Sequence, residues 1–196
     1  MRRLIVLTTA ILLGGHLVSG YAAPPVPLRG DKLLLGVSPG HNEFRLETRG
    51  VDITNTNNTS ADPVLHGATL RLFSSAGDHF DATYTMPSGA NWEYRGAAGQ
   101  NLGYIYKDAN RVNGPISIIK IRAGRSTHIV GRDLVFTLHT NPEPVNAVFT
   151  IGDQGYCMSF GGTVKRFAPD HLYIALKAPA PALCPASPSG AFLDGR

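Results

Sequence analysis

One pentapeptide in this chain has the spacing of a catalytic motif. Gly36-Val37-Ser38-Pro39-Gly40 matches G-x-S-x-G, the turn that exposes a serine nucleophile in α/β-hydrolases, and His171 with Asp133 or Asp153 has the side chains to complete a triad. The residue after such a serine must donate its backbone N–H to the oxyanion, but Pro39 has no N–H. Proline and glycine at this point also oppose the helix that follows the serine in that fold. We therefore interpret the motif as a turn between two strands and predict no catalytic residue.

The histidines lack the spacing of a metal site. After residue 22 they stand singly, at His41, His66, His79, His128, His139 and His171, and no H-E-x-x-H motif occurs. His128 and His139 fall on neighbouring expected strands, where they could approach each other. Asp78 and Asp81 flank His79 and could ligate calcium together with loop carbonyls, but a polar hairpin turn explains the same residues. We predict no metal site and no cofactor.

Aromatic side chains gather in one stretch of the chain. On strands, Trp92 and Tyr94 would share a face, as would Tyr104 and Tyr106. A strip of this kind can stack on sugar rings, because aromatic faces offer apolar contact beside polar groups. The alternative is that the rings fill the core or pair across strands. The candidate binding residues are Trp92, Tyr94, Tyr104 and Tyr106.

The amino terminus has the form of a secretory signal peptide. A basic start, Met1-Arg2-Arg3, precedes an apolar run from Leu4 to Leu13, and small residues end at Ala22. The run is about half of the ~20 residues that a membrane-spanning helix needs. We expect cleavage after Ala22, the main alternative being an uncleaved anchor. The mature chain would then be secreted, to the periplasm or the extracellular space, with no transmembrane segment.

The mature chain has little net charge. The sequence contains 18 Lys and Arg against 14 Asp and Glu, and removal of Arg2 and Arg3 leaves 16 basic residues and a net charge of +2. The basic residues stand singly apart from Lys165-Arg166, whereas nucleic-acid binding usually shows a basic stripe. We therefore expect no nucleic-acid partner.

Hydrophobic alternation predicts an all-β fold, a single β-sandwich-like domain of about ten short, mainly antiparallel strands. In the segment 116–122, Ile119 and Ile121 oppose Ile118, Lys120 and Arg122, so that one face is buried and the other meets water or a partner. Gly and Pro residues separate such segments. The expected strands are Lys32–Leu35, Glu43–Thr48, Ala68–Ser74, Phe80–Met86, Leu102–Lys107, Ser117–Arg122, Thr127–Val130, Val135–Leu138, Val145–Ile151, Tyr156–Phe160 and Leu172–Leu176.

Four segments follow from these patterns. They are a signal peptide (1–22), a Pro-rich linker (23–30), the β-sandwich domain (31–178) and a Pro-rich tail (179–196). Cys157 and Cys184 are the only cysteines, and in an exported chain we expect them to form one disulfide that ties the tail to a core strand. The alternative is a free buried Cys157 and an exposed Cys184.

A set of short segments also carries a resemblance when it is taken in chain order. The segments are Asp62-Pro63, Gly67–Phe73, Trp92–Gly96, Gly103–Asp108, Asn113–Ile116, Tyr156–Gly162 and Lys177–Pro185. Their order resembles a group of uncharacterised secreted bacterial β-rich proteins, over roughly Asp31 to Pro185. The resemblance implies a secreted β-fold and paired cysteines. It implies no activity and no catalytic residue.

Two classes of function remain open. The first is a non-catalytic extracellular or cell-envelope-associated β-domain that binds a polysaccharide or an envelope protein. The second is a secreted hydrolase whose histidine and carboxylate groups are brought together only by the fold. A concave pocket with convergent polar groups would favour the enzyme. We favour the binding domain because no catalytic constellation is visible in the sequence.

Overall fold

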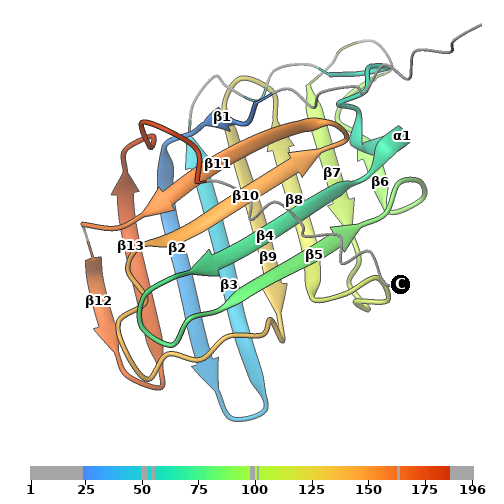
Figure 1. Ribbon diagram of the computed structural model, residues 1–196. Coiled ribbons are helices and arrows are strands. Elements are labelled where there is room, and N and C mark those ends of the chain that lie inside the picture. Colours follow the sequence, from blue (N-terminus) through green and yellow to red (C-terminus); the bar gives the residue numbers. More distant parts are fainter. Residues whose placement is uncertain are drawn as a thin grey trace, which may run out of the picture.

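The computed structural model describes residues 24–49, 53, 56–97, 100, 102–162 and 164–185. The expected signal peptide and the tail beyond residue 185 lie outside the described residues. Within them, two sheets are stacked as layers, and the strands of one layer cross those of the other (Figure 1). The all-β fold class expected from the sequence is confirmed.

The smaller layer is a five-stranded sheet. Its spatial order is β1 (Val26–Pro27), β11 (Gln154–Phe160), β10 (Val145–Ile151), β4 (Ala68–Ser74) and β5 (Asp81–Met86). All of its neighbouring strands are antiparallel except β1 and β11, which run parallel. A four-residue helix, α1 (Pro63–His66), precedes β4 and is capped by Asp62, whose side chain accepts a hydrogen bond from the Val64 N–H.

The larger layer is an antiparallel sheet of eight strands. Its spatial order is β12 (Val164–Ala168), β13 (Leu172–Ala178), β2 (Gly30–Ser38), β3 (His41–Arg49), β9 (Ser126–Arg132), β8 (Ile116–Arg122), β7 (Gly103–Lys107) and β6 (Trp92–Tyr94). The chain enters this layer with β2 and β3, leaves it for β4 and β5, and returns with β6. The strands at the centre of the layer, β3 and β9, are therefore far apart in sequence.

The core lies between the two layers and is filled by alternate residues of the strands. Leu33 and Leu35 of β2, together with Phe44 and Leu46 of β3, are fully buried, while the residues between them lie on the opposite side of the sheet. The facing layer supplies Leu70, Leu72, Phe149 and Phe160 among others. This period-two burial leaves each sheet with one outward face.

One expected strand is absent. The segment Val135–Leu138 does alternate, since Leu134, Phe136 and Leu138 are buried and the residues between them are exposed, but it pairs with no strand. Instead, the Asn42 Nδ2 group donates to the carbonyl oxygens of Leu134 and Phe136, both at 2.9 Å. The alternation therefore predicted the buried positions correctly, but the backbone groups of this segment bond to side chains and not to a neighbouring strand.

The segment expected to be a linker contributes to the sandwich. Val26 and Pro27 pair with Tyr156 and Cys157 of β11, and the Leu28 N–H donates to the Cys157 carbonyl at 2.7 Å. Leu28 is also buried in the core. The sequence analysis missed β1 as a strand because two residues are too few for an alternation pattern.

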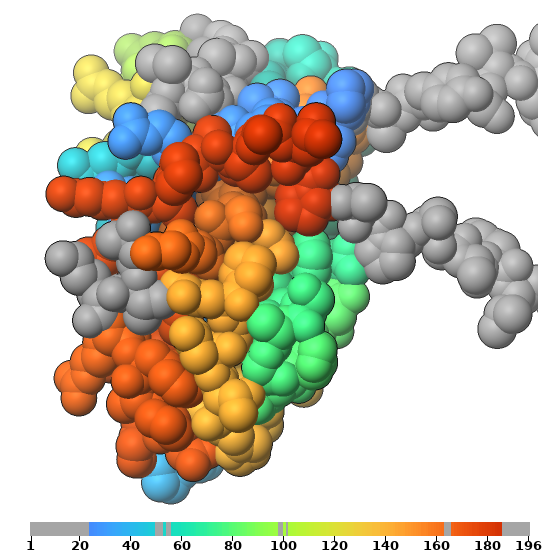
Figure 2. All heavy atoms as spheres, turned by 60° about the vertical axis from the view of Figure 1, so that its left-hand side comes forward, coloured from blue at the N-terminus to red at the C-terminus, as the bar shows by residue number. Residues whose placement is uncertain are grey.

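The expected disulfide between Cys157 and Cys184 is present, with the two Cα atoms 5.6 Å apart. Cys157 is fully buried on β11. The Cys184 Sγ atom lies 3.2 Å from the Pro25 carbonyl oxygen, and Figure 2 shows the red C-terminal segment lying beside the blue residues of the N-terminal segment. The described part of the Pro-rich tail is thus held against the five-stranded sheet.

Candidate functional site

The four aromatic candidates do not form an exposed strip. Trp92, Tyr104 and Tyr106 are 4%, 1% and 1% exposed, and only Tyr94 is open to solvent, at 39%. Their rings pair across β6 and β7, with centroids 5.1 Å apart for Trp92 and Tyr106 and 5.8 Å apart for Tyr94 and Tyr104. Burial raises the pKa of Tyr104 to about 12. Both strands turn these faces toward the core, so the core-filling alternative describes three of the four side chains.

The G-x-S-x-G segment is a hairpin turn. Ser38 and His41 are paired residues at the ends of β2 and β3, and Pro39 and Gly40 form the two-residue connection. Gly40 has a φ of 87°, which glycine adopts readily. In the described part of the chain, no side-chain hydrogen bond joins Ser38 to a histidine or an aspartate. The interpretation as a turn between two strands is confirmed.

His139 meets Asp170 rather than His128. Its Nδ1 atom forms a close hydrogen bond with the Asp170 carboxylate, and the two side chains are 68% and 60% exposed. Both residues lie in connections, His139 between β9 and β10 and Asp170 between β12 and β13. No hydroxyl or thiol of the described residues is hydrogen-bonded to His139. The pair therefore lacks an adjacent nucleophile.

Asp78 joins the β4–β5 turn to the β9–β10 connection through hydrogen bonds. Its carboxylate accepts hydrogen bonds from the His139 N–H at 2.6 Å, the Thr140 N–H at 3.1 Å and the Thr140 hydroxyl at 2.8 Å. Burial by itself would raise the pKa of Asp78, but these bonds and one from Thr137 outweigh it and lower the pKa to about 2. No group of three possible metal ligands occurs among the described residues. Asp78 thus anchors the β9–β10 connection.

A shallow pocket of about 420 Å³ lies beside this anchor, between the β4–β5 turn and the β9–β10 connection. Phe80 and Phe136, whose ring centroids are 6.0 Å apart, both line it, but they are only 7% and 5% exposed. Both carboxylates that line the pocket already have protein partners. Asp78 accepts hydrogen bonds from the β9–β10 connection, and Asp81 pairs with Arg71 at 2.6 Å. The pocket therefore offers a ligand few free groups.

The outward face of the eight-stranded sheet is rich in cations. Along β2, β3, β9, β8 and β7 the residues that alternate with the core positions are half-buried or exposed. The cations at these positions are Lys32, Arg45, Arg49, Lys107, Lys120, Arg122 and Arg132. The carboxylates on the same side are Glu43, Glu47 and Asp31, which pairs with Arg49 at 3.1 Å, and Lys107 pairs with Glu93 of the adjoining β6 at 2.9 Å. We call this surface the basic face, because its cations outnumber its carboxylates.

Strand register places the charges of the basic face in two crosswise rows. In the first row Lys32 lies opposite Glu47, Glu47 opposite His128, and His128 opposite Lys120. In the second row Leu34, Arg45, Val130, Ile118 and Lys107 are consecutive partners. Each row crosses at least four strands. Because neighbouring strands are about 4.8 Å apart, each row extends over at least ~14 Å. The first row is polar or charged throughout, whereas the second row combines two cations with three half-buried aliphatic side chains.

His128 lies at the centre of this surface, and its burial has the largest effect on its pKa. Burial lowers its pKa most, and Lys120, Arg45 and Lys32 lower it further, while Glu47 acts in the opposite direction. The His128 Nε2 atom is 3.9 Å from the Glu47 carboxylate. A nearby carboxylate would ordinarily favour the charged imidazolium. The net lowering shows that burial and the surrounding cations outweigh Glu47 at the centre of the basic face.

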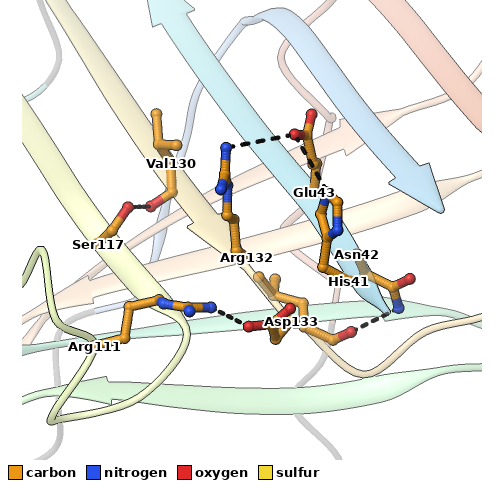
Figure 3. Close-up of polar contacts among 9 residues, drawn as sticks. His41, Asn42, Glu43, Arg111, Ser117, Val130, Arg132 and Asp133 are labelled. Carbon is orange, nitrogen blue, oxygen red and sulfur yellow. Dashed lines mark hydrogen bonds and ion pairs between the residues drawn. The ribbon is translucent and has the colours of Figure 1, made fainter. Parts of the chain in front are cut away.

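Ion pairs form a network at one end of the basic face (Figure 3). The Arg132 guanidinium lies 3.8 Å from the Glu43 carboxylate, which is also 3.8 Å from the His41 ring. Beside it, Arg111 of the β7–β8 connection forms a close ion pair with Asp133. Arg111 and Arg132 both line a shallow pocket of about 290 Å³. The basic face thus ends in two arginines that come from different segments.

The basic face was not predicted, although part of its signal is in the sequence. The expected strand around Lys120 and Arg122 placed both on an outward face. The same alternation applies to Arg45 on β3 and Arg132 on β9, but only the register of the sheet shows that these strands are neighbours. The fold thus brings together basic residues that stand singly in the sequence. The absence of a basic stripe from the sequence therefore no longer argues against a polyanionic partner.

Comparison of the chain with known protein families, with curated proteins and with solved structures returns no match. Among the described residues, no helix has the length and apolar character needed to span a membrane.

Proposed function

We propose that this protein is an exported, non-catalytic binding domain that holds an acidic polysaccharide on the basic face. The observation that carries the proposal is the arrangement of Lys32, Arg45 and Lys120 around His128 on four adjacent strands. Cations held close together on a rigid sheet repel one another, and a polyanion laid across the rows relieves that repulsion. The role as a binding surface therefore follows from charge complementarity.

The surface between the cations suits a sugar chain. Half-buried Leu34, Ile118 and Val130 offer apolar contact to the carbon faces of sugar rings, and Glu43 and Glu47 can accept hydrogen bonds from sugar hydroxyls. No phenylalanine, tyrosine or tryptophan occupies an outward position of β2, β3, β9, β8 or β7 among the described residues, so the extended base-stacking platform of single-strand nucleic-acid binders is missing.

Two sequence features support export. The amino terminus has the pattern of a signal peptide, and the chain carries a disulfide, which forms in oxidising compartments. Acidic polysaccharides of the cell envelope and its surroundings are polyanions that such a protein would meet. The hydrolase alternative has weaker support, because the His139–Asp170 pair is exposed in two connections and has no bonded nucleophile among the described residues.

A direct binding assay tests the proposal. The purified protein is titrated with polygalacturonate, with neutral dextran and with single-stranded DNA at about 0.05 M and about 0.3 M NaCl. We expect polygalacturonate to bind, the affinity to fall at the higher salt concentration, and dextran not to bind. Failure to bind polygalacturonate, or tighter binding of DNA than of polygalacturonate, would overturn the proposal.

Charge-removing variants locate the surface. Arg45→Gln and Lys120→Gln should each weaken binding of polygalacturonate by about threefold to fivefold, which corresponds to a contribution below about 1 kcal/mol for an exposed charge. The matched control is Arg71→Gln, because Arg71 lies on the outward face of the five-stranded sheet, on the other side of the sandwich. Equal losses in all three variants would show that only total charge matters.

A further inference from the structure

Arg132 and Arg111 form a discrete unit at the end of the basic face. Arg132 is the next outward residue of β9 after Val130, and its partner across the sheet is Glu43, so it lies one outward position along β9 from the second row. Arg111 lies in the β7–β8 connection, and Figure 3 shows its guanidinium group pointing to Asp133, while that of Arg132 points to Glu43. The pocket they share is lined by Asn110, Arg111, Gly114, Pro115, Arg132 and Asp133. The pocket therefore lies beside the second row, one outward position further along β9.

The β7–β8 connection, which carries Arg111, is held in place by the side chain of Asp108. Asp108 is only 5% exposed, and its carboxylate accepts hydrogen bonds from the Val112 N–H at 3.0 Å and the Asn113 N–H at 2.8 Å. The Asn113 amide donates to the same carboxylate at 3.2 Å. Arg111 itself has a φ of 55°, a conformation that needs such support. The position of Arg111 is therefore preorganised before any ligand binds.

Both arginines keep donors for a ligand. Arg111 uses Nη1 in its close pair with Asp133, and Arg132 has only the 3.8 Å approach to Glu43, beyond hydrogen-bond distance. A guanidinium has five N–H donors in a planar fork that matches the two oxygens of a carboxylate. Their neighbours Asp133 and Glu43 offset most of the positive charge. Such a pocket favours a monoanion that takes directed hydrogen bonds over a group with dense charge.

We propose that Arg111 and Arg132 clamp the carboxylate of a uronic acid unit, so that the basic face prefers uronate polymers to sulfated ones. This inference rests on the proposed function, because it needs a polymer on the basic face. The rows through Arg45 and Lys120 supply charge attraction that any polyanion satisfies. The clamp adds a bidentate contact that a planar carboxylate satisfies best. Selectivity, rather than affinity alone, is therefore the property that the clamp controls.

The test compares two polyanions on charge-conserving variants. Lysine keeps the charge of arginine but has no planar fork. For Arg111→Lys combined with Arg132→Lys, we expect the affinity for polygalacturonate to fall about tenfold, with less than a twofold change for dextran sulfate. The matched control is Arg29→Lys combined with Arg125→Lys, which changes two exposed arginines that belong neither to this pocket nor to the basic face. Near-ultraviolet circular dichroism of Trp92 verifies folding.

The outcomes separate this inference from the proposed function. Equal losses of affinity for both polymers, or a double lysine variant that behaves like its control, would overturn the clamp. If the wild type still binds polygalacturonate, the proposed function of the basic face is unaffected by that result. Failure of the wild type to bind either polymer would overturn the proposed function and the clamp with it. A selective loss for polygalacturonate supports both.

Discussion

Lys120 of β8 lies directly opposite His128 of β9, on the outward side of the eight-stranded sheet. Glu47 of β3 lies opposite His128 on its other side. An imidazole between an ammonium group and a carboxylate would be electrostatically balanced, but burial together with Lys120, Arg45 and Lys32 lowers the pKa of His128. The centre of the basic face therefore resists a further proton when no anion is bound.

The pH dependence of stability follows from this lowered pKa. The unfolded chain binds a proton at His128 more readily than the folded protein, because the folded pKa is below the ordinary value of 6.5. The contribution of His128 to stability is complete above about pH 6.5 and is lost as the pH falls below it, until the folded pKa is passed. Urea unfolding between about pH 8 and about pH 5 should show this loss in the wild type and a smaller loss in His128→Gln.

The matched control for this measurement is His66→Gln, which changes an exposed histidine of α1. It should follow the wild-type pH profile. Parallel profiles for the wild type and His128→Gln would contradict the electrostatic description of the basic face.

Removal of the disulfide should cost stability without loss of the fold. The bridge closes a loop with a sequence separation of 27, for which the chain-entropy relation gives about 3–4 kcal/mol. The two facing layers supply the core without the tail, so Cys157→Ala combined with Cys184→Ala should still fold. Urea unfolding of this variant should give a free energy of unfolding lower by about that amount. A difference below about 1 kcal/mol would show that the tail adds little.

Trp92 should behave as a core residue and not as a ligand contact. Its ring is 4% exposed and packs against Tyr106, so Trp92→Ala should lower the free energy of unfolding by about 3–5 kcal/mol. Trp92→Phe keeps most of the volume and should bind polygalacturonate as the wild type does. Loss of binding in a folded Trp92→Phe variant would return the aromatic stretch to the site.

Asp62 should be a large single contributor to local stability. Its buried carboxylate accepts hydrogen bonds from the Asn58 N–H at 2.8 Å, the Val64 N–H at 2.9 Å and the Tyr94 hydroxyl at 2.8 Å. Asp62→Ala leaves all three donors without this acceptor and should lower the free energy of unfolding by about 2–3 kcal/mol. Tyr94→Phe removes one of the bonds and should cost only about 1 kcal/mol. Equal effects of the two substitutions, measured by urea unfolding, would contradict this ranking.

Much of the fold could be predicted from local patterns. The expected strands Ala68–Ser74 and Val145–Ile151 have the boundaries of β4 and β10, because period-two burial and β pairing coincide there. Burial and β pairing do not coincide at Val135–Leu138, where the Asn42 side chain, and not a neighbouring strand, bonds to the backbone. The helix α1 and strand β12 were missed. Four or five residues are too short for a periodic signal.

The candidate site could be predicted only in part. The outward direction of Lys120 follows from alternation within its own strand. Its proximity to Arg45 and Lys32 depends on β8, β9, β3 and β2 being neighbours, and nothing in a local pattern gives that order. The aromatic residues illustrate the converse. Tyr106 fell within an expected strand and Trp92 did not, and which face of β6 and β7 meets the second sheet is decided by the packing of the whole domain.

The most direct measurement of the central claim is a map of where the polymer binds. Amide chemical shifts of the isotope-labelled protein are followed by nuclear magnetic resonance as polygalacturonate oligomers are added. The account predicts that the largest changes fall on β2, β3, β9 and β8, around Arg45, Lys120 and His128, with little change on β4 and β5. Changes centred on the five-stranded sheet, or spread evenly over both sheets, would contradict the assignment of the basic face as the binding surface.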